Sequence, residues 1–153
     1  MEYSHSDDEL VKQPIGYWSW AAYYKAVVSR TRSALAEFGT TQPQWWVLAQ
    51  LARAEAPGTR DDVCAVLRDY LDTGQDTVET EIDATVERGR VTESAGGRLQ
   101  LTAGGRTFFD KVAAVQGELW AERHAGVSGE EYLTTLKVLQ RFVHNTGGTA
   151  WHH

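Results

Sequence analysis

The sequence is short of several features that define other classes of protein. It contains one cysteine, three prolines and one methionine among 153 residues. A lone cysteine excludes a disulfide within the chain and fits a reducing cytoplasm. No apolar run approaches the ~20 residues that a membrane-spanning helix needs, and the polar, acidic start of the chain is unlike a signal peptide. We therefore expect a globular, cytoplasmic protein with no membrane segment.

Positive charge is also scarce. The 15 lysines and arginines face 21 aspartates and glutamates, which leaves a net charge of −6. Nucleic-acid binders usually collect lysine and arginine, because neutralising phosphate supplies most of the affinity. The excess of acidic residues therefore lowers the expectation of nucleic-acid binding, although the charge of the binding face matters more than the net charge of the whole chain. Tryptophan, in contrast, is abundant, with six residues.

Recognisable catalytic chemistry is missing as well. We find no nucleophile motif, no phosphate-binding loop and no dinucleotide fingerprint. The histidines His5, His124 and His144 are scattered, and their spacing repeats no pair of metal ligands. We expect no catalytic residue, no cofactor and no metal site, which speaks against an enzyme. Cys64, beside Val63 on an apolar helix face, is expected to be an inert buried thiol.

Apolar residues recur at spacings of three and four along the first half of the chain, which predicts amphipathic helices. The first helix is expected over 17–38, with Gly39 as its stop, and a second begins at Thr41. A third opens with Thr59 and Asp62, which are spaced as a capping box, and is expected to run on to about residue 71. A fourth helix follows before the chain changes to alternating residues.

The second half of the chain predicts a hairpin and two more helices. Ala95–Gly97 supplies turn residues between two short alternating segments. A long helix is expected over 102–124, and Ser128 opens the last helix. Five apolar residues of that last helix are expected to point inward: Leu133, Leu136, Leu139, Phe142 and Val143.

The domain organisation predicted from these elements is simple. Residues 1–16 form a flexible arm, residues 17–143 form one domain, and residues 144–153 form a flexible tail. The closing pair His152–His153 is consistent with a remnant of an expression tag. The fold class expected is mainly α with a small β-hairpin.

Four motifs occur in the order and at the spacing of a known family. They are Thr40–Leu48, Gly89–Val91, Leu101–Gly105 and Val127–Glu131. Each is weak alone, but together they resemble the multiple-antibiotic-resistance regulator (MarR) family of bacterial transcription factors, and the resemblance covers about residues 17–143.

The resemblance implies a homodimer and a winged helix-turn-helix. The winged segment would span about residues 41–105 and bind double-stranded DNA, and dimerisation helices would span 17–38 and 106–143. A pocket for a small-molecule effector would lie between these parts. The residues expected to contact DNA are Gln75, Thr77, Thr80, Arg88 and Arg98.

The segment that would enter the DNA groove departs from this pattern. Between Asp61 and Glu93 the chain has ten acidic and only three basic residues. Arg88 is the one cation of the expected recognition helix, and Arg98 is the one cation between the ends of the wing at Val91 and Leu101. Acidic side chains facing phosphate would repel it.

The aromatic residues form the second candidate site. Large rings from three helices could wall a cavity for a planar aromatic ligand. The ring residues expected to bind it are Trp20, Tyr24, Trp45, Trp46 and Phe108. Aromatic residues at helical spacing are more often core or interface residues, and Trp45 and Trp46, as neighbours, cannot share one helix face.

Three functions remain open at this point. The first is a MarR-type homodimeric regulator that binds DNA and responds to an aromatic small molecule. The second is a MarR-fold protein that has lost DNA binding and works through its aromatic pocket, as a binder or an enzyme. The third is an interaction module whose acidic face mimics DNA for a basic partner.

Overall fold

The computed structural model describes residues 5–71 and 75–148, so the pair His152–His153 lies outside the described residues. The chain divides into two compact units, Met1–Gly117 and Glu118–His153. Among the described residues, no helix is both long and apolar enough to cross a membrane. A single turn, α1 (Asp7–Leu10), lies within the segment that we expected to be a flexible arm.

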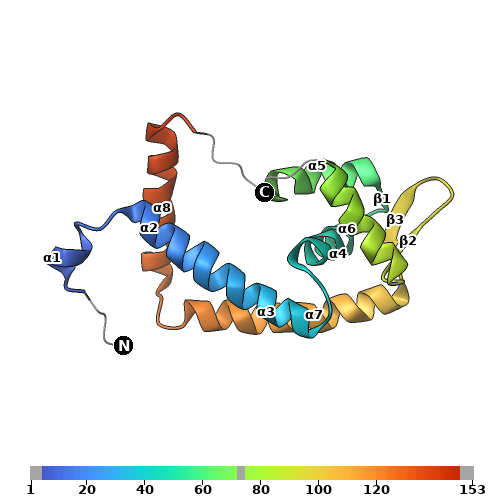
Figure 1. The fold of residues 1–153 in the computed structure, drawn as a ribbon, viewed down its shortest axis with the longest axis horizontal. Helices are drawn as coiled ribbons and strands as arrows, with labels where there is room; N and C mark the ends of the chain where they lie inside the picture. Colours follow the sequence, from blue (N-terminus) through green and yellow to red (C-terminus); the bar gives the residue numbers. More distant parts are fainter. Residues whose placement is uncertain (1–4, 72–74, 149–153) are drawn as a thin grey trace. The chain divides into compact units, whose positions relative to one another are not determined.

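The expected first helix is present as three consecutive helical segments. They are α2 (Ile15–Ser19), η1 (Trp20–Val28) and α3 (Ser29–Glu37), which follow one another without a break (Figure 1). The middle segment is a π-helix, which the three-and-four spacing did not predict. Gly39 then adopts a φ of 60°, a conformation that glycine reaches without steric cost, and the chain turns.

The winged part follows the predicted order of helices and strands. Its elements are α4 (Gln42–Arg53), β1 (Gly58–Thr59), α5 (Arg60–Leu71), α6 (Gln75–Glu87), β2 (Val91–Glu93) and β3 (Arg98–Leu101). The strands form an antiparallel sheet in the order β1-β3-β2, in which Val91 pairs with Leu101 and Gly58 pairs with Leu99. The hairpin of β2 and β3 was predicted, whereas β1 is a finding of the structure.

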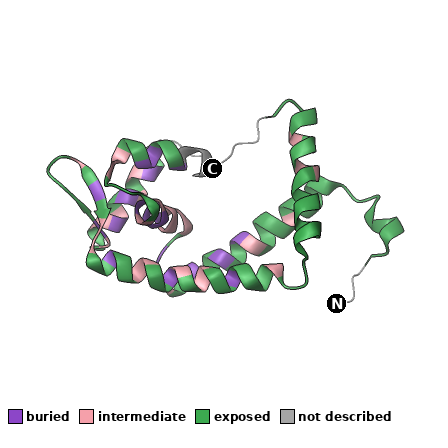
Figure 2. Cartoon of the chain, turned by 180° about the vertical axis from the view of Figure 1, so that it is seen from behind, coloured by how far each residue is buried: buried purple, intermediate pink, exposed green. Residues whose placement is uncertain are grey.

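The core of this part is built by side chains from all of its longer elements. Its buried members are Val47, Leu48, Leu51, Val63, Cys64, Leu67, Val78, Ile82, Val91 and Leu99. Cys64 is 1% exposed, which confirms the expected buried thiol. Figure 2 shows buried residues in the winged part and on the helices before and after it, and none along α8 (Gly129–Asn145).

The last unit contains the end of α7 (Ala103–His124) and α8. Ser128 caps α8 as predicted, since its hydroxyl accepts a hydrogen bond from the Glu131 amide and donates one to the Glu131 carboxylate. Of the α8 apolar residues expected to point inward, Leu139 and Val143 are half-buried, whereas Leu133, Leu136 and Phe142 are exposed, Leu133 and Phe142 to 50% each.

Candidate nucleic-acid interface

The helix-turn-helix begins at a capping box. The backbone amide and hydroxyl of Thr59 both donate to the Asp62 carboxylate at 2.8 Å, and the Asp62 amide donates back to the Thr59 hydroxyl. The backbone hydrogen bond, followed by that of the hydroxyl, lowers the pKa of Asp62. This confirms the predicted start of α5, and the helix also reaches Leu71 as expected.

Helix α6 has one buried and one exposed face. Val78 and Ile82 are fully buried in the core. The described residues that are most exposed on the opposite face are Thr77, Thr80, Asp83 and Glu87. This face thus offers two hydroxyls near its start and two carboxylates further on. Gln75 is the first residue of α6, and its side chain lies outside the described part.

Arg88, expected to contact DNA, is occupied by contacts within the chain. Its guanidinium donates to the carbonyl oxygen of Gly39 and, at 2.9 Å, to the side-chain oxygen of Gln44. Gln44 is itself buried and accepts a hydrogen bond from Thr40. Arg88 therefore ties the end of α6 to the turn between α3 and α4.

Arg98, the expected wing cation, directly follows the turn of the hairpin. It is the first residue of β3 and pairs with Thr59 of β1. Its guanidinium donates to the carbonyl oxygen of Pro57 at 2.9 Å. The side chain thus stabilises the β1–β3 pairing, and the tip, Ala95–Gly97, carries no charge.

A cation that the sequence analysis missed, Arg60, links three elements. It is the first residue of α5, and it donates through Nε and Nη2 to the carboxylate of Glu93 on β2, with the shortest contact at 2.7 Å. Its Nη1 lies 2.7 Å from the carboxylate of Asp83 on α6. The Glu93 contact, followed by that of Asp83, raises the pKa of Arg60, and Arg60 lowers the pKa of Glu93.

No local signal could have revealed this cluster. Arg60 and Glu93 are 33 positions apart, and only the folded wing brings β2 to the start of α5.

The expected aromatic ligand residues fall into two surroundings. Trp45 stacks on Phe109 of α7, with ring centroids 4.9 Å apart and planes inclined by 7°. Trp46 and Phe108 are partly buried and pack against the core. Trp45 and Trp46 therefore point in different directions, as their adjacency requires. The Arg90 guanidinium lies 3.5 Å from the centroid of the Phe108 ring.

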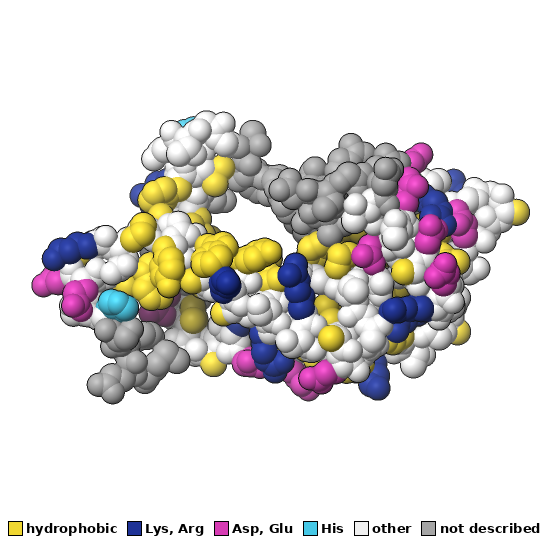
Figure 3. Space-filling model, viewed as in Figure 1, with side chains coloured by type: hydrophobic (Ala, Val, Ile, Leu, Met, Phe, Trp, Pro, Cys, Tyr) yellow, Lys and Arg dark blue, Asp and Glu magenta, His cyan; other side chains and the backbone are white. Residues whose placement is uncertain are grey.

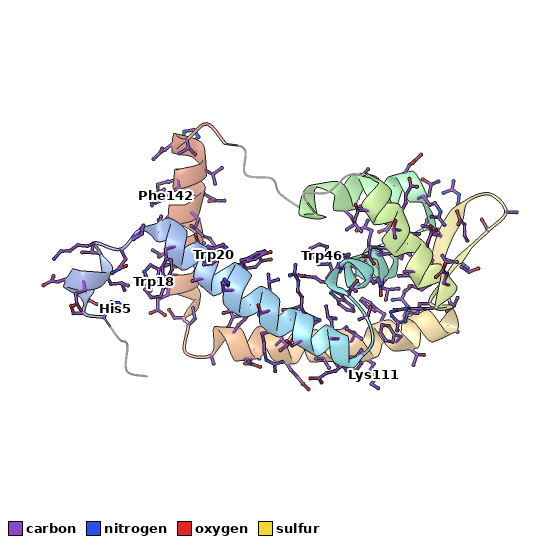
Figure 4. All side chains as sticks on the ribbon, in the orientation of Figure 1. His5, Trp18, Trp20, Trp46, Lys111 and Phe142 are labelled. Carbon is purple, nitrogen blue, oxygen red and sulfur yellow. The ribbon has the colours of Figure 1, made fainter. Side chains whose placement is uncertain are left out.

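The other two aromatic residues are exposed on η1. Trp20 is 48% exposed and Tyr24 is 52% exposed. The Lys25 ammonium lies 5.0 Å from the Trp20 ring, and the Arg32 guanidinium lies 5.9 Å from the Tyr24 ring. Figure 3 shows hydrophobic side chains gathered over the N-terminal helices, and Figure 4 shows Trp20 and Trp46 on different elements, η1 and α4.

The fold is that of known transcription factors. No family profile matches the sequence, and no curated protein sequence matches it either. The reduced form of MarR from E. coli matches with a TM-score of 0.66 at 19% identity, over 90% of this chain and 99% of that one. A Mycobacterium tuberculosis MarR-family protein in complex with DNA matches with 0.64 at 19% identity, over 86% and 98%. The same protein in complex with p-aminosalicylic acid matches with 0.63 at 21% identity, over 85% and 98%.

These matches, with the helix-turn-helix and wing described above, define the class as winged helix-turn-helix. Within that class, the chain has the fold of the MarR-family regulators, as the four motifs predicted.

Proposed function

We propose that the chain is a MarR-type homodimeric transcriptional regulator that binds double-stranded DNA and responds to an aromatic small molecule. The observation that carries this proposal is a winged helix-turn-helix in which the hydroxyl side chains of Thr77 and Thr80 are exposed near the start of α6. Recognition helices of this motif present their N-terminal residues to base edges. A protein of the same fold has been solved with DNA.

In this proposal the contacts divide between bases and backbone. Gln75, Thr77 and Thr80 belong to the N-terminal half of α6 and would reach base edges, since amide and hydroxyl groups read donors and acceptors there. Arg88 and Arg98 would contact the sugar–phosphate backbone after release from their carbonyl partners. Arg98→Ala should then weaken binding to all DNA sequences alike.

The proposed effector is a planar aromatic molecule bound by Trp20, Tyr24, Trp45, Trp46 and Phe108. A protein of the same fold has been solved with p-aminosalicylic acid. The exposed rings of Trp20 and Tyr24 leave faces on which such a ligand could stack, and burying them would contribute affinity. Binding should quench tryptophan fluorescence and raise Tm. A panel of phenolic and polycyclic compounds that changes neither would contradict this part of the proposal.

One set of contacts favours a second function, a MarR-fold protein that acts through its aromatic residues without binding DNA. Asp83 and Glu87 occupy the exposed face of α6. Three arginines of the winged part, Arg60, Arg88 and Arg98, each have partners within the chain. The same acidic face would suit the third function, binding of a basic protein partner.

A salt-dependent DNA titration separates these functions. Labelled, sheared genomic DNA is titrated by fluorescence anisotropy at several salt concentrations. Lysine and arginine side chains that neutralise phosphate release the counterions of the DNA, so the affinity falls as salt rises. The regulator should bind at low salt, with affinity that falls steeply as salt rises. The second function would be favoured if the protein binds no DNA at the lowest salt while an aromatic ligand still quenches its tryptophan fluorescence.

A further inference from the structure

We propose that Arg60 is a phosphate-binding residue that Asp83 and Glu93 keep occupied while the protein is free of DNA. The proposal rests on the DNA binding proposed above and adds an intramolecular competitor to it. The carboxylates of Asp83 and Glu93 thereby take the place of phosphate oxygens at Arg60, on the face that would meet the DNA.

The place of Arg60 in the fold suits a phosphate contact. It is the first residue of α5, which is the first helix of the helix-turn-helix. That helix crosses the DNA backbone in this motif, whereas the second helix enters the groove. A helix start also carries partial positive charge, which favours a nearby anion. A cation at the start of this helix would therefore lie close to the phosphates of the DNA backbone.

The geometry of the Glu93 contact is the one that arginine uses for phosphate. Nε and Nη2 of Arg60 donate to the two carboxylate oxygens at 3.0 and 2.7 Å, so one edge of the guanidinium is matched by two acceptors. Phosphate presents the same pair of acceptors, and arginine binds both groups in this two-pronged way. Asp83 occupies the remaining nitrogen, Nη1, at 2.7 Å. All three guanidinium nitrogens are thus used.

The competing contacts are accessible to solvent and to DNA. The exposed fraction is 28% for the Arg60 side chain, 57% for Asp83 and 29% for Glu93. Exposed ion pairs add little net stability, so exchanging a carboxylate for a phosphate would not unfold the wing. This also accounts for two acidic residues on a DNA-facing surface: they are compensated by Arg60 in the free protein.

The test compares variants that release Arg60 with variants that do not. Asp83→Asn with Glu93→Gln removes both carboxylates and retains the size of each side chain. Arg60→Gln, made in the wild-type and in the double variant, removes the cation. Glu87→Gln is the matched control, because Glu87 is an exposed carboxylate one turn beyond Asp83 on α6 and is not a partner of Arg60. Each variant is checked for an unchanged circular dichroism spectrum and then titrated with DNA by anisotropy.

The double variant should bind DNA more tightly, and log affinity should fall with log salt up to about 0.9 more steeply, which is the slope of one phosphate contact. Arg60→Gln should cancel this extra slope in the double variant and change the slope of the wild-type protein less, because Asp83 and Glu93 compete with phosphate for Arg60 there. Arg60→Lys in the double variant should retain the extra slope, because a lysine still neutralises phosphate. Glu87→Gln should leave the slope unchanged.

Two results would overturn the proposal alone. One is an equal effect of Arg60→Gln on the slope in both backgrounds, and the other is an unchanged slope in the double variant although the wild-type protein binds DNA. Failure of every variant to bind DNA at low salt would instead overturn the proposed regulator function, and this inference with it.

Discussion

Gly105, near the start of α7, lies against the backbone of Arg90, the residue that precedes β2. A Cβ atom at this position would lie 1.8 Å from the carbonyl oxygen of Arg90, far inside any van der Waals contact. The same carbonyl accepts hydrogen bonds from the amide and the hydroxyl of Thr102, while the Gly105 amide donates to that hydroxyl at 2.9 Å. The helix and the Arg90 backbone can approach this closely only because residue 105 has no side chain.

We predict that Gly105→Ala destabilises the protein by about 3 kcal/mol, the upper range for a forced overlap in a packed region. Gly104→Ala is the matched control, since its Cβ would meet only the Thr102 hydroxyl oxygen at 3.8 Å. That change should be neutral or stabilise by about 0.5 kcal/mol, because alanine favours the helix. Urea unfolding measures both values. Equal stability of the two variants would contradict the close approach.

At the scale of elements, two helices begin with carboxylates that titrate below their ordinary range. The hydroxyl and then the amide of Ser128 lower the pKa of Glu131 from 4.5, and the contacts of Thr59 lower the pKa of Asp62 from 3.8. A carboxylate whose pKa is lowered by folding stabilises the folded state above its unfolded pKa, and this stability is lost as pH falls through the folded pKa.

We therefore predict that Tm falls as pH is lowered below about 5, in part through these two caps. Ser128→Ala should lower Tm at neutral pH and flatten the acid limb of the profile, because Glu131 then returns toward its ordinary pKa. Ser94→Ala, in the wing turn, removes a hydroxyl that holds no carboxylate in the described structure and serves as the control. Differential scanning calorimetry from pH 3 to 7 measures the curves, and an unchanged acid limb in Ser128→Ala would contradict the prediction.

The elements that could be predicted are those whose signals are local. The Thr59–Asp62 cap spans three residues, and the wing follows from alternation around Ala95–Gly97. Strand β1 has only two residues, too few for alternation to show, and it forms because Leu99 and Arg98 lie beside it. The π-helix was missed since its sequence also satisfies an α-helical period.

The candidate site was less predictable than the fold. Residue type indicated Arg88 and Arg98 as cations near the recognition helix, but their partners are the carbonyl oxygens of Gly39 and Pro57, more than 40 positions away. Backbone carbonyls are present at every residue, so no pattern of side chains predicts which one an arginine will reach. Whether these residues contact DNA stays a prediction.

At the scale of the whole molecule, apolar surface remains uncovered in each unit. On the N-terminal helices, Tyr17 is 55% and Tyr23 is 64% exposed. On α8, Leu133 and Phe142 are each 50% exposed. Exposed apolar faces of this kind usually mark an interface between proteins, and pairing of identical faces about a two-fold axis is the commonest arrangement.

We predict a homodimer that buries both faces, which sedimentation equilibrium at micromolar concentration would detect as twice the chain mass. Phe142→Glu should shift the equilibrium to monomer by more than tenfold, because a charge would be buried without a partner. Val66→Glu is the control, since Val66 is an exposed apolar residue on α5, 40% accessible, outside the proposed interface. A wild-type monomer at these concentrations would contradict the prediction.

The π-helical segment also has a consequence for how the gene can change. A π-helix closes each turn with i to i+5 hydrogen bonds, so it holds more residues per turn than an α-helix. Removing one codon, that of Ala22, should let Trp20–Val28 relax toward α-helix, because the tighter α-helical turns complete nearly the same rotation with fewer residues. Tyr17 and Trp18 would then keep about the same direction relative to α3, so the shortened chain should melt higher and still associate. A single-codon deletion could therefore stabilise this helix without changing the face that it presents.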